Sequence, residues 1–124
     1  MTQNNLSHFA IYIDDLNRAK NFYSEVFDWG FNDYGQEGFL QIKDSEDGNL
    51  IGALQSRNYS PLPEKVLGFE CTISVENLDS TLERVIQNGG TIVLPKVEIP
   101  YVGWISKFTD SEGNLVCAMQ YHNV

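Results

Sequence analysis

The chain has 124 residues with 42% hydrophobic and 20% charged content, which fits one globular domain and argues against wholesale disorder. Its formal net charge of −9 disfavours nucleic acid and anionic membrane surfaces as partners, because the field of the protein would repel phosphates. The two cysteines form no CxxC pair and no apolar run approaches transmembrane length, so we expect neither a zinc ribbon nor a membrane anchor, and a cytoplasmic location.

The first half of the chain predicts a strand, a helix and three further strands. Residues alternate between apolar and polar faces from His8 to Ile13, which indicates a strand with one core face. Asp14-Asp15 offers a helix cap, and apolar residues then recur at three-and-four spacing up to Phe27. Glycine turns and short alternating runs between Trp29 and Gln55 predict three strands, the last two forming a hairpin.

The second half predicts the same order. Alternation from Phe69 to Val75 indicates a strand, and Asn77 can cap a helix whose apolar stripe includes Ile86. Gly89-Gly90 is typical of a helix end. The residues from Pro95 to Gly103 predict an irregular loop, which is either a lid over a cavity or an exposed turn. Further strands are expected at 91–94, 104–108 and 115–121.

Two internal sequence repeats indicate that one structural unit occurs twice in the chain. The turn-and-strand pattern after Gly48-Asn49 returns after Gly113-Asn114, which lies 65 residues later. The strand that begins at His8 returns at Glu70, which lies 62 residues later. Two units are too few for an open solenoid, so we predict one pseudo-symmetric domain over residues 1–124. Its parts are module one at about 6–57, a proline-containing linker at about 58–67, and module two at about 68–122.

These patterns resemble a known superfamily. The opening HFAIYIDDLNRAKNFYSEVFDWGF, the helix end VIQNGG and the closing GWISKFTDSEGNLVCAMQ are similar to the vicinal oxygen chelate superfamily. That superfamily includes glyoxalase I, bleomycin-resistance proteins and extradiol dioxygenases. The resemblance implies an α+β fold in which two tandem βαβββ modules form an incomplete eight-stranded barrel, with the helices outside and a cavity on the concave face. It also implies a homodimer that binds a small molecule.

The resemblance further implies where a metal would lie. Metal-dependent members place four ligands in the cavity, one on the first strand and one on the last strand of each module. By motif, those positions are His8, Gly52, Glu70 and Cys117 here, and the internal repeat pairs them in the same way. Gly52 has no side chain, so His8 and Glu70 form an incomplete site. The cofactor is therefore either none or a divalent ion such as zinc, nickel, manganese or iron.

The resemblance also indicates which other residues line the cavity. Tyr12 and Ser74 share the inward face of their strands with His8 and Glu70. Cys117 is either a ligand or a small buried hydrophobic residue. Tyr101 and Trp104 are candidates for an aromatic wall of the cavity, and core packing is the alternative for Trp104. The expected substrate-binding set is Tyr12, Gly52, Ser74, Tyr101, Trp104 and Cys117.

Two functions remain open from the sequence. The first is a glyoxalase-related lyase or isomerase, or a dioxygenase-like enzyme, which acts on a small oxygenated metabolite. In that enzyme Glu70 would be the general base, and His8 the acid or orienting group. The second is a non-catalytic module that sequesters a small aromatic or drug-like molecule, as bleomycin-resistance relatives do. The broken ligand set motivates the second function.

Overall fold

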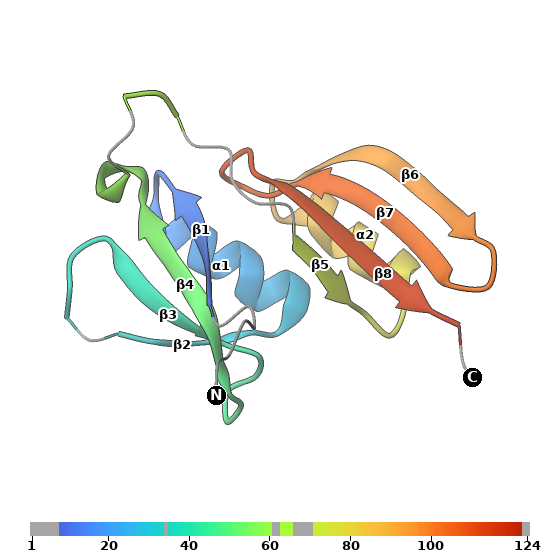
Figure 1. The fold of residues 1–124 in the computed structure, drawn as a ribbon, viewed down its shortest axis with the longest axis horizontal. Coiled ribbons are helices and arrows are strands. Elements are labelled where there is room, and N and C mark those ends of the chain that lie inside the picture. The colour runs from blue at the N-terminus through green and yellow to red at the C-terminus, as the bar shows by residue number, and fades with distance from the viewer. Residues whose placement is uncertain (1–7, 34, 61–62, 66–70, 123–124) are drawn as a thin grey trace, which may run out of the picture.

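The structure is a computed structural model that describes residues 8–33, 35–60, 63–65 and 71–122. Each half of the chain forms a β-α-β-β-β unit, so the order predicted for both modules is confirmed (Figure 1). The elements of module one are β1 Phe9–Ile13, α1 Leu16–Phe27, β2 Gly30–Asn32, β3 Phe39–Lys43, β4 Leu50–Ser56 and the short 3-10 helix η1 Arg57–Tyr59. Those of module two are β5 Cys71–Ser74, α2 Leu78–Gln87, β6 Thr91–Ile99, β7 Gly103–Thr109 and β8 Leu115–Tyr121.

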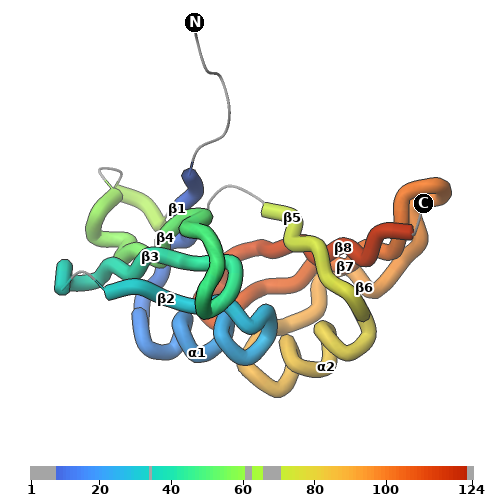
Figure 2. Tube along the Cα trace, turned by 90° about the horizontal axis from the view of Figure 1, so that it is seen from below, coloured from blue at the N-terminus to red at the C-terminus, as the bar shows by residue number. Residues whose placement is uncertain are grey.

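Each module contributes one four-stranded mixed sheet. The strand orders are β1-β4-β3-β2 and β5-β8-β7-β6, and the first pair of each sheet is parallel. Both helices lie on the same side of the two sheets, as Figure 2 shows. The expected α+β two-module fold with an open arrangement of eight strands and external helices is therefore confirmed. No helix in the described ranges has the length and apolar character needed to cross a membrane.

The two helices begin and end as their sequences predict. The side chain of Asp15 accepts a hydrogen bond from Arg18 N and caps α1, and Asn77 caps α2 in the same way through Ser80 N. Gly89 follows α2 with a φ of 93°, the left-handed conformation that glycine tolerates. One expectation was wrong, because Ile86 is 62% exposed.

One hydrophobic core joins the two modules. It includes Phe22 and Tyr23 of α1, Val85 of α2 and Phe108 of β7, all of them buried. Tyr23 stacks on Trp29 with 5.1 Å between ring centroids. Since the helix-facing sides of both sheets pack into this core, neither module could retain its burial alone.

Strand β6 replaces the irregular loop that the sequence predicts at Pro95 to Gly103. The strand runs through Pro95 and ends at Ile99, so only its tight turn to β7 is irregular. The proline is tolerated because β6 is the edge strand of its sheet and its pairing with β7 shifts register between Ile92 and Val97. The prediction of a long loop was therefore wrong.

The last strands of the two modules, β4 and β8, differ in which of the repeat-related residues point into the core. In module two, Cys117 pairs with Thr72, while its neighbours Val116 and Ala118 point into the core. In module one, the β3–β4 pairing skips Ile51, and Gly52 pairs with Phe9 and Ile42. Ile42 is fully buried in the core, so this bulge turns Gly52 toward the helices.

Candidate functional site

The acidic turn between β7 and β8 anchors module two to module one. Glu112 is buried, and its Oε1 accepts hydrogen bonds from the backbone N–H groups of Asp14 and Asp15, each 2.9 Å long. Asn114 Nδ2 donates to the carbonyl oxygen of Tyr12 at 2.7 Å. A carboxylate at these N–H groups also opposes the positive end of α1. We call this contact, between turn 110–114 and the β1–α1 corner at 12–18, the docked joint.

Two arginines neutralise the carboxylates of the docked joint. Arg18 Nε lies 2.5 Å from Glu112 Oε2, and Arg18 Nη2 lies 2.8 Å from Oε1. Arg57 Nε lies 2.9 Å from Asp14 Oδ1, and Arg57 Nη2 donates to the Glu112 carbonyl oxygen at 2.8 Å. Burial alone would raise the pKa of Glu112, but hydrogen bonds from Arg18 and from the backbone outweigh it and lower the pKa to about 2.

A buried tyrosine completes the joint. Tyr23 donates its hydroxyl proton to Asp110 Oδ2 at 2.7 Å. Burial, and then the neighbouring Asp110 carboxylate, raise the pKa of Tyr23 well above its usual value, so the hydroxyl remains a donor. Asp110 also accepts from the backbone N–H groups of Glu112 and Asn114 and from the Asn114 amide. The turn therefore has a fixed conformation.

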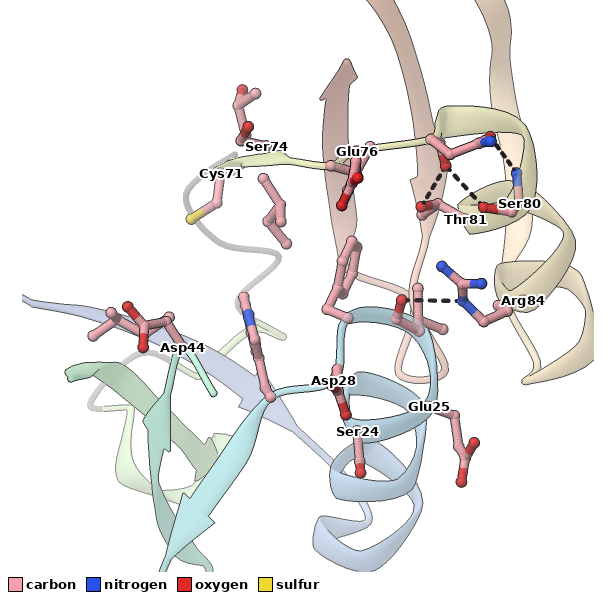
Figure 3. A pocket seen from close by; sticks show the side chains of 18 of the residues that line it. Ser24, Glu25, Asp28, Asp44, Cys71, Ser74, Glu76, Ser80, Thr81 and Arg84 are labelled. Atoms are coloured by element: carbon pink, nitrogen blue, oxygen red, sulfur yellow. Dashed lines mark hydrogen bonds between the residues drawn. The ribbon is translucent and has the colours of Figure 1, made fainter. Parts of the chain in front are cut away.

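The repeat-related contact on the other side of the molecule is open. It would join turn 44–49 to the β5–α2 corner at 74–80, and we call this pair of segments the open joint. Among the described residues, no hydrogen bond or ion pair links the two segments. A cleft of about 1230 Å³ lies there instead, between Asp44 on one side and Glu76 and Ser80 on the other. Figure 3 shows Glu76 above the cleft and the end of α1 below it.

The cleft combines apolar walls with a charged rim. Its apolar residues include Phe9, Trp29 and Ile51 from module one and Ile73 and Val75 from module two. Trp29 reaches from the core to this wall, since it stacks on Tyr23 and lies 6.5 Å from the ring of Phe9. The charged residues of the rim are Glu25, Asp28, Asp44, Glu76 and Arg84. Apolar walls with a few polar groups are typical of small-molecule sites.

A second hollow continues from the cleft along the seam between the modules. It has a volume of about 30 Å³, which is small beside the cleft. Tyr12 and Asn114 line it, together with Phe9 and Trp29, which it shares with the cleft. The hollow is too small for an organic ligand.

The structure brings few of the predicted site residues together. Ser74 lines the large cleft, and Tyr12 lines only the small hollow. His8 is exposed at the start of β1, and Glu70 lies outside the described residues, so their catalytic pairing stays a prediction.

The predicted aromatic wall and Cys117 lie away from the cleft. Tyr101 is 99% exposed in the β6–β7 turn, and Trp104 contacts Lys96 and His122. Cys117 is 1% exposed and does not line the cleft.

Sequence reasoning missed the aromatic and charged residues of the cleft. Phe9 fell on the predicted core face of its strand, and no sequence pattern singled out Trp29 or Arg84. A signal was nevertheless present in the internal repeat. The position of Arg18 in module one is Ser80 in module two, so the second joint lacks the arginine that holds the first.

Comparison with known proteins identifies the family. Residues 5–118 match the model of the Glyoxalase/Bleomycin resistance protein/Dioxygenase superfamily. The chain belongs to this superfamily. Its relatives include the "Putative glyoxylase CFP32" of Mycobacterium bovis, which is 26% identical over 110 residues, covering 82% of the chain and 40% of the relative. The chain therefore spans less than half the length of this curated relative.

Solved structures of the superfamily share the fold. A glyoxalase/bleomycin resistance protein/dioxygenase family enzyme from Burkholderia phytofirmans PsJN has a TM-score of 0.75 at 16% identity, covering 94% of this chain and 98% of that one. TnmS3, an antibiotic binding protein from Streptomyces sp. CB03234, has a TM-score of 0.72 at 20% identity, covering 98% and 99%. At these identities the likeness shows the fold alone.

The residues present do not fit the four-ligand metal site expected for the superfamily. Gly52 supplies no donor, and it faces α1 with no space for a side chain, because a Cβ there would lie 2.5 Å from the carbonyl oxygen of Phe9. Cys117 is buried beside Thr72 and Lys107 on the other face of its sheet. In the described ranges no three His, Cys, Asp or Glu side chains gather as a metal would require.

Proposed function

We propose that this superfamily member binds a small organic molecule in the inter-module cleft and releases it unchanged. The observation that carries the proposal is the cleft itself, where apolar walls meet charged and polar side chains at the open joint. Its volume of about 1230 Å³ lies above the range of roughly 300–1,000 Å³ that is usual for ligand pockets, so a small organic molecule fits within it. The name of TnmS3, an antibiotic binding protein with the same fold, is consistent with such a role.

The donor set supports binding over glyoxalase-type chemistry. A metal that polarises substrate oxygens needs several Lewis-basic ligands, and Gly52 removes one of the four inherited positions. The charged rim can orient a ligand, but its carboxylates are exposed and no described pair of them is arranged as an acid and a base. The curated relative named as a glyoxylase motivates an enzymatic role as the second candidate.

Titration with the neutral aromatic probe 2-(1-naphthyl)ethanol tests the proposal. We expect one molecule to bind per chain, and the compound recovered after incubation to be unchanged by mass spectrometry. Glu76→Trp should weaken binding at least about tenfold, since the indole would occupy the cleft into which Glu76 projects. Glu76→Gln, which keeps the size of the side chain, should bind the neutral probe as the wild type does.

Glu83→Trp is the matched control for the added indole, because Glu83 is exposed on α2 and does not line the cleft. If Glu76→Trp and Glu83→Trp both bind normally, the ligand lies elsewhere and the proposal is wrong. A chemically altered product that disappears in His8→Ala or Glu70→Gln variants would instead establish the enzymatic candidate.

A further inference from the structure

We propose that the natural ligand of the cleft is an organic cation, with an ammonium or guanidinium group attached to a flat apolar body. This inference rests on the proposed function, since it names the ligand of the same cleft. Three observations support it: the negative charge of the rim, the guanidinium groups bound at the repeat-related positions of the docked joint, and the aromatic walls of the cleft.

The rim of the cleft is strongly negative. Four carboxylates and one guanidinium line it, and three of the carboxylates, those of Glu25, Asp28 and Glu76, have no hydrogen bond or ion pair within the described ranges. Arg84 offsets only one of these four charges, and its Nε donates to the carbonyl oxygen of Val26 at 3.5 Å. A cationic ligand would gain from this field, and an anionic ligand would be repelled.

In the docked joint, the acidic residues that are repeat-related to those of the open joint bind guanidinium groups. There, Asp14 and Glu112 hold the guanidinium groups of Arg57 and Arg18 at 2.9 Å and 2.5 Å. The internal repeat places Glu76 at the position of Asp14 and Ser80 at the position of Arg18. The acidic side chain is thus retained at the corner of the open joint, while the arginine of that corner, which in the docked joint pairs with Glu112 and not with Asp14, is absent. Space and charge for a cation remain beside Glu76 and Ser80, and the ligand can supply that cation.

The walls of the cleft suit the rest of such a ligand. Phe9 and Trp29 present rings whose planes meet at 49°, and Ile51 and Ile73 flank them. An apolar body in contact with these side chains is removed from water, and a cation close to an aromatic face gains a further attraction. A ligand with both parts would use the walls and the rim at once.

Three probes with one apolar body separate the charge preference from binding itself. They are 2-(1-naphthyl)ethylamine, which is a cation at pH 7, the neutral 2-(1-naphthyl)ethanol, and the anion 1-naphthylacetate. Calorimetric titration at low salt should give dissociation constants about three- to tenfold lower for the amine than for the alcohol, with the acetate weakest. Glu76→Gln should reduce the advantage of the amine and leave the alcohol unchanged. Glu83→Gln, which changes the net charge equally outside the cleft, should leave all three constants unchanged.

Each other outcome has a distinct meaning. If the three probes bind equally, the cleft binds small molecules but the inference of a cation is wrong. If the amine is preferred and Glu76→Gln with Asp44→Asn leaves that preference intact, the field does not come from this rim, which also overturns the inference. If none of the three probes binds, both the inference and the proposed function are overturned.

Discussion

At the scale of single residues, Glu112 is the side chain that joins the modules. Its carboxylate is buried, yet it is matched by two backbone N–H groups and by Arg18, so the ion is satisfied on every side. Asp47, the repeat-related residue, is exposed and forms no such contact. One residue in the same turn therefore binds the modules together in one repeat and not in the other.

The lowered pKa of Glu112 predicts a specific loss of stability in acid. A carboxylate with a pKa of about 2 in the folded protein and 4.5 in the unfolded chain stabilises the fold above pH 4.5. That contribution, about 3 kcal/mol, is lost as the pH falls from 4.5 toward 2. Glu112→Gln should lower the free energy of unfolding at pH 7 by about 2–3 kcal/mol, and should show a smaller difference between pH 7 and pH 3 than the wild type.

Urea unfolding at the two pH values measures both effects. Glu83→Gln is the control, because this exposed carboxylate has no ion pair in the described part of the chain. If Glu112→Gln retained the full pH dependence of the wild type, the docked joint would not depend on the ionised carboxylate.

At the scale of elements, local rules predicted the fold better than the site. The helix bounds followed from apolar spacing and from the caps Asp15 and Asn77, which act within a few residues. The prediction missed strand β6 at Pro95. A proline is tolerated in an edge strand, and which strand lies at the edge depends on sheet pairing that the local sequence does not show. The sequence placed Gly52 in the cavity, whereas in the structure it faces the helices. A one-residue bulge changes the face of the sheet on which a residue lies, and no local pattern marked that bulge.

The bulge predicts that a metal site cannot be restored at Gly52. Gly52→Glu supplies the carboxylate that the superfamily position lacks, but its Cβ would lie 2.5 Å from the carbonyl oxygen of Phe9 and within 3.1 Å of the Phe9 ring. The backbone must shift, so we expect a loss of about 2–4 kcal/mol and no gain of zinc binding. Thermal unfolding and zinc titration of the purified variant measure these effects.

His8→Ala is the control for this variant, since an exposed side chain at the start of β1 should change the free energy of unfolding by no more than about 0.5 kcal/mol. A Gly52→Glu protein that is as stable as the wild type and binds one zinc ion would show that position 52 faces the cavity after all.

At the scale of the whole molecule, the fold repeats a unit but not its contacts. The site could not be read from either repeat alone, because the cleft exists only where Phe9 and Trp29 of module one meet Ile73 and Glu76 of module two. Of the predicted site residues that the structure describes, which exclude Glu70, only Ser74 lines the cleft. The homodimer and the cytoplasmic location expected from the sequence stay predictions.

Copying the docked joint onto the open joint should close the cleft. Ser80→Arg with Asp47→Glu recreates the Arg18–Glu112 pair at its repeat-related positions. If the new ion pair forms, turn 44–49 is drawn onto the β5–α2 corner and the cleft between them narrows.

We expect the double variant to bind 2-(1-naphthyl)ethanol at least about tenfold more weakly than the wild type. Asp47→Glu alone should bind this neutral probe normally, because it brings no cation across the joint. Ser80→Arg alone lines the cleft and faces only the shorter native Asp47 side chain, so it should weaken binding less than the double variant does. A double-mutant cycle on urea unfolding should give a favourable coupling of about 0.5–1 kcal/mol. Normal probe binding by a double variant that shows this coupling would mean that the joint can close without covering the ligand site, which would place the ligand outside the cleft.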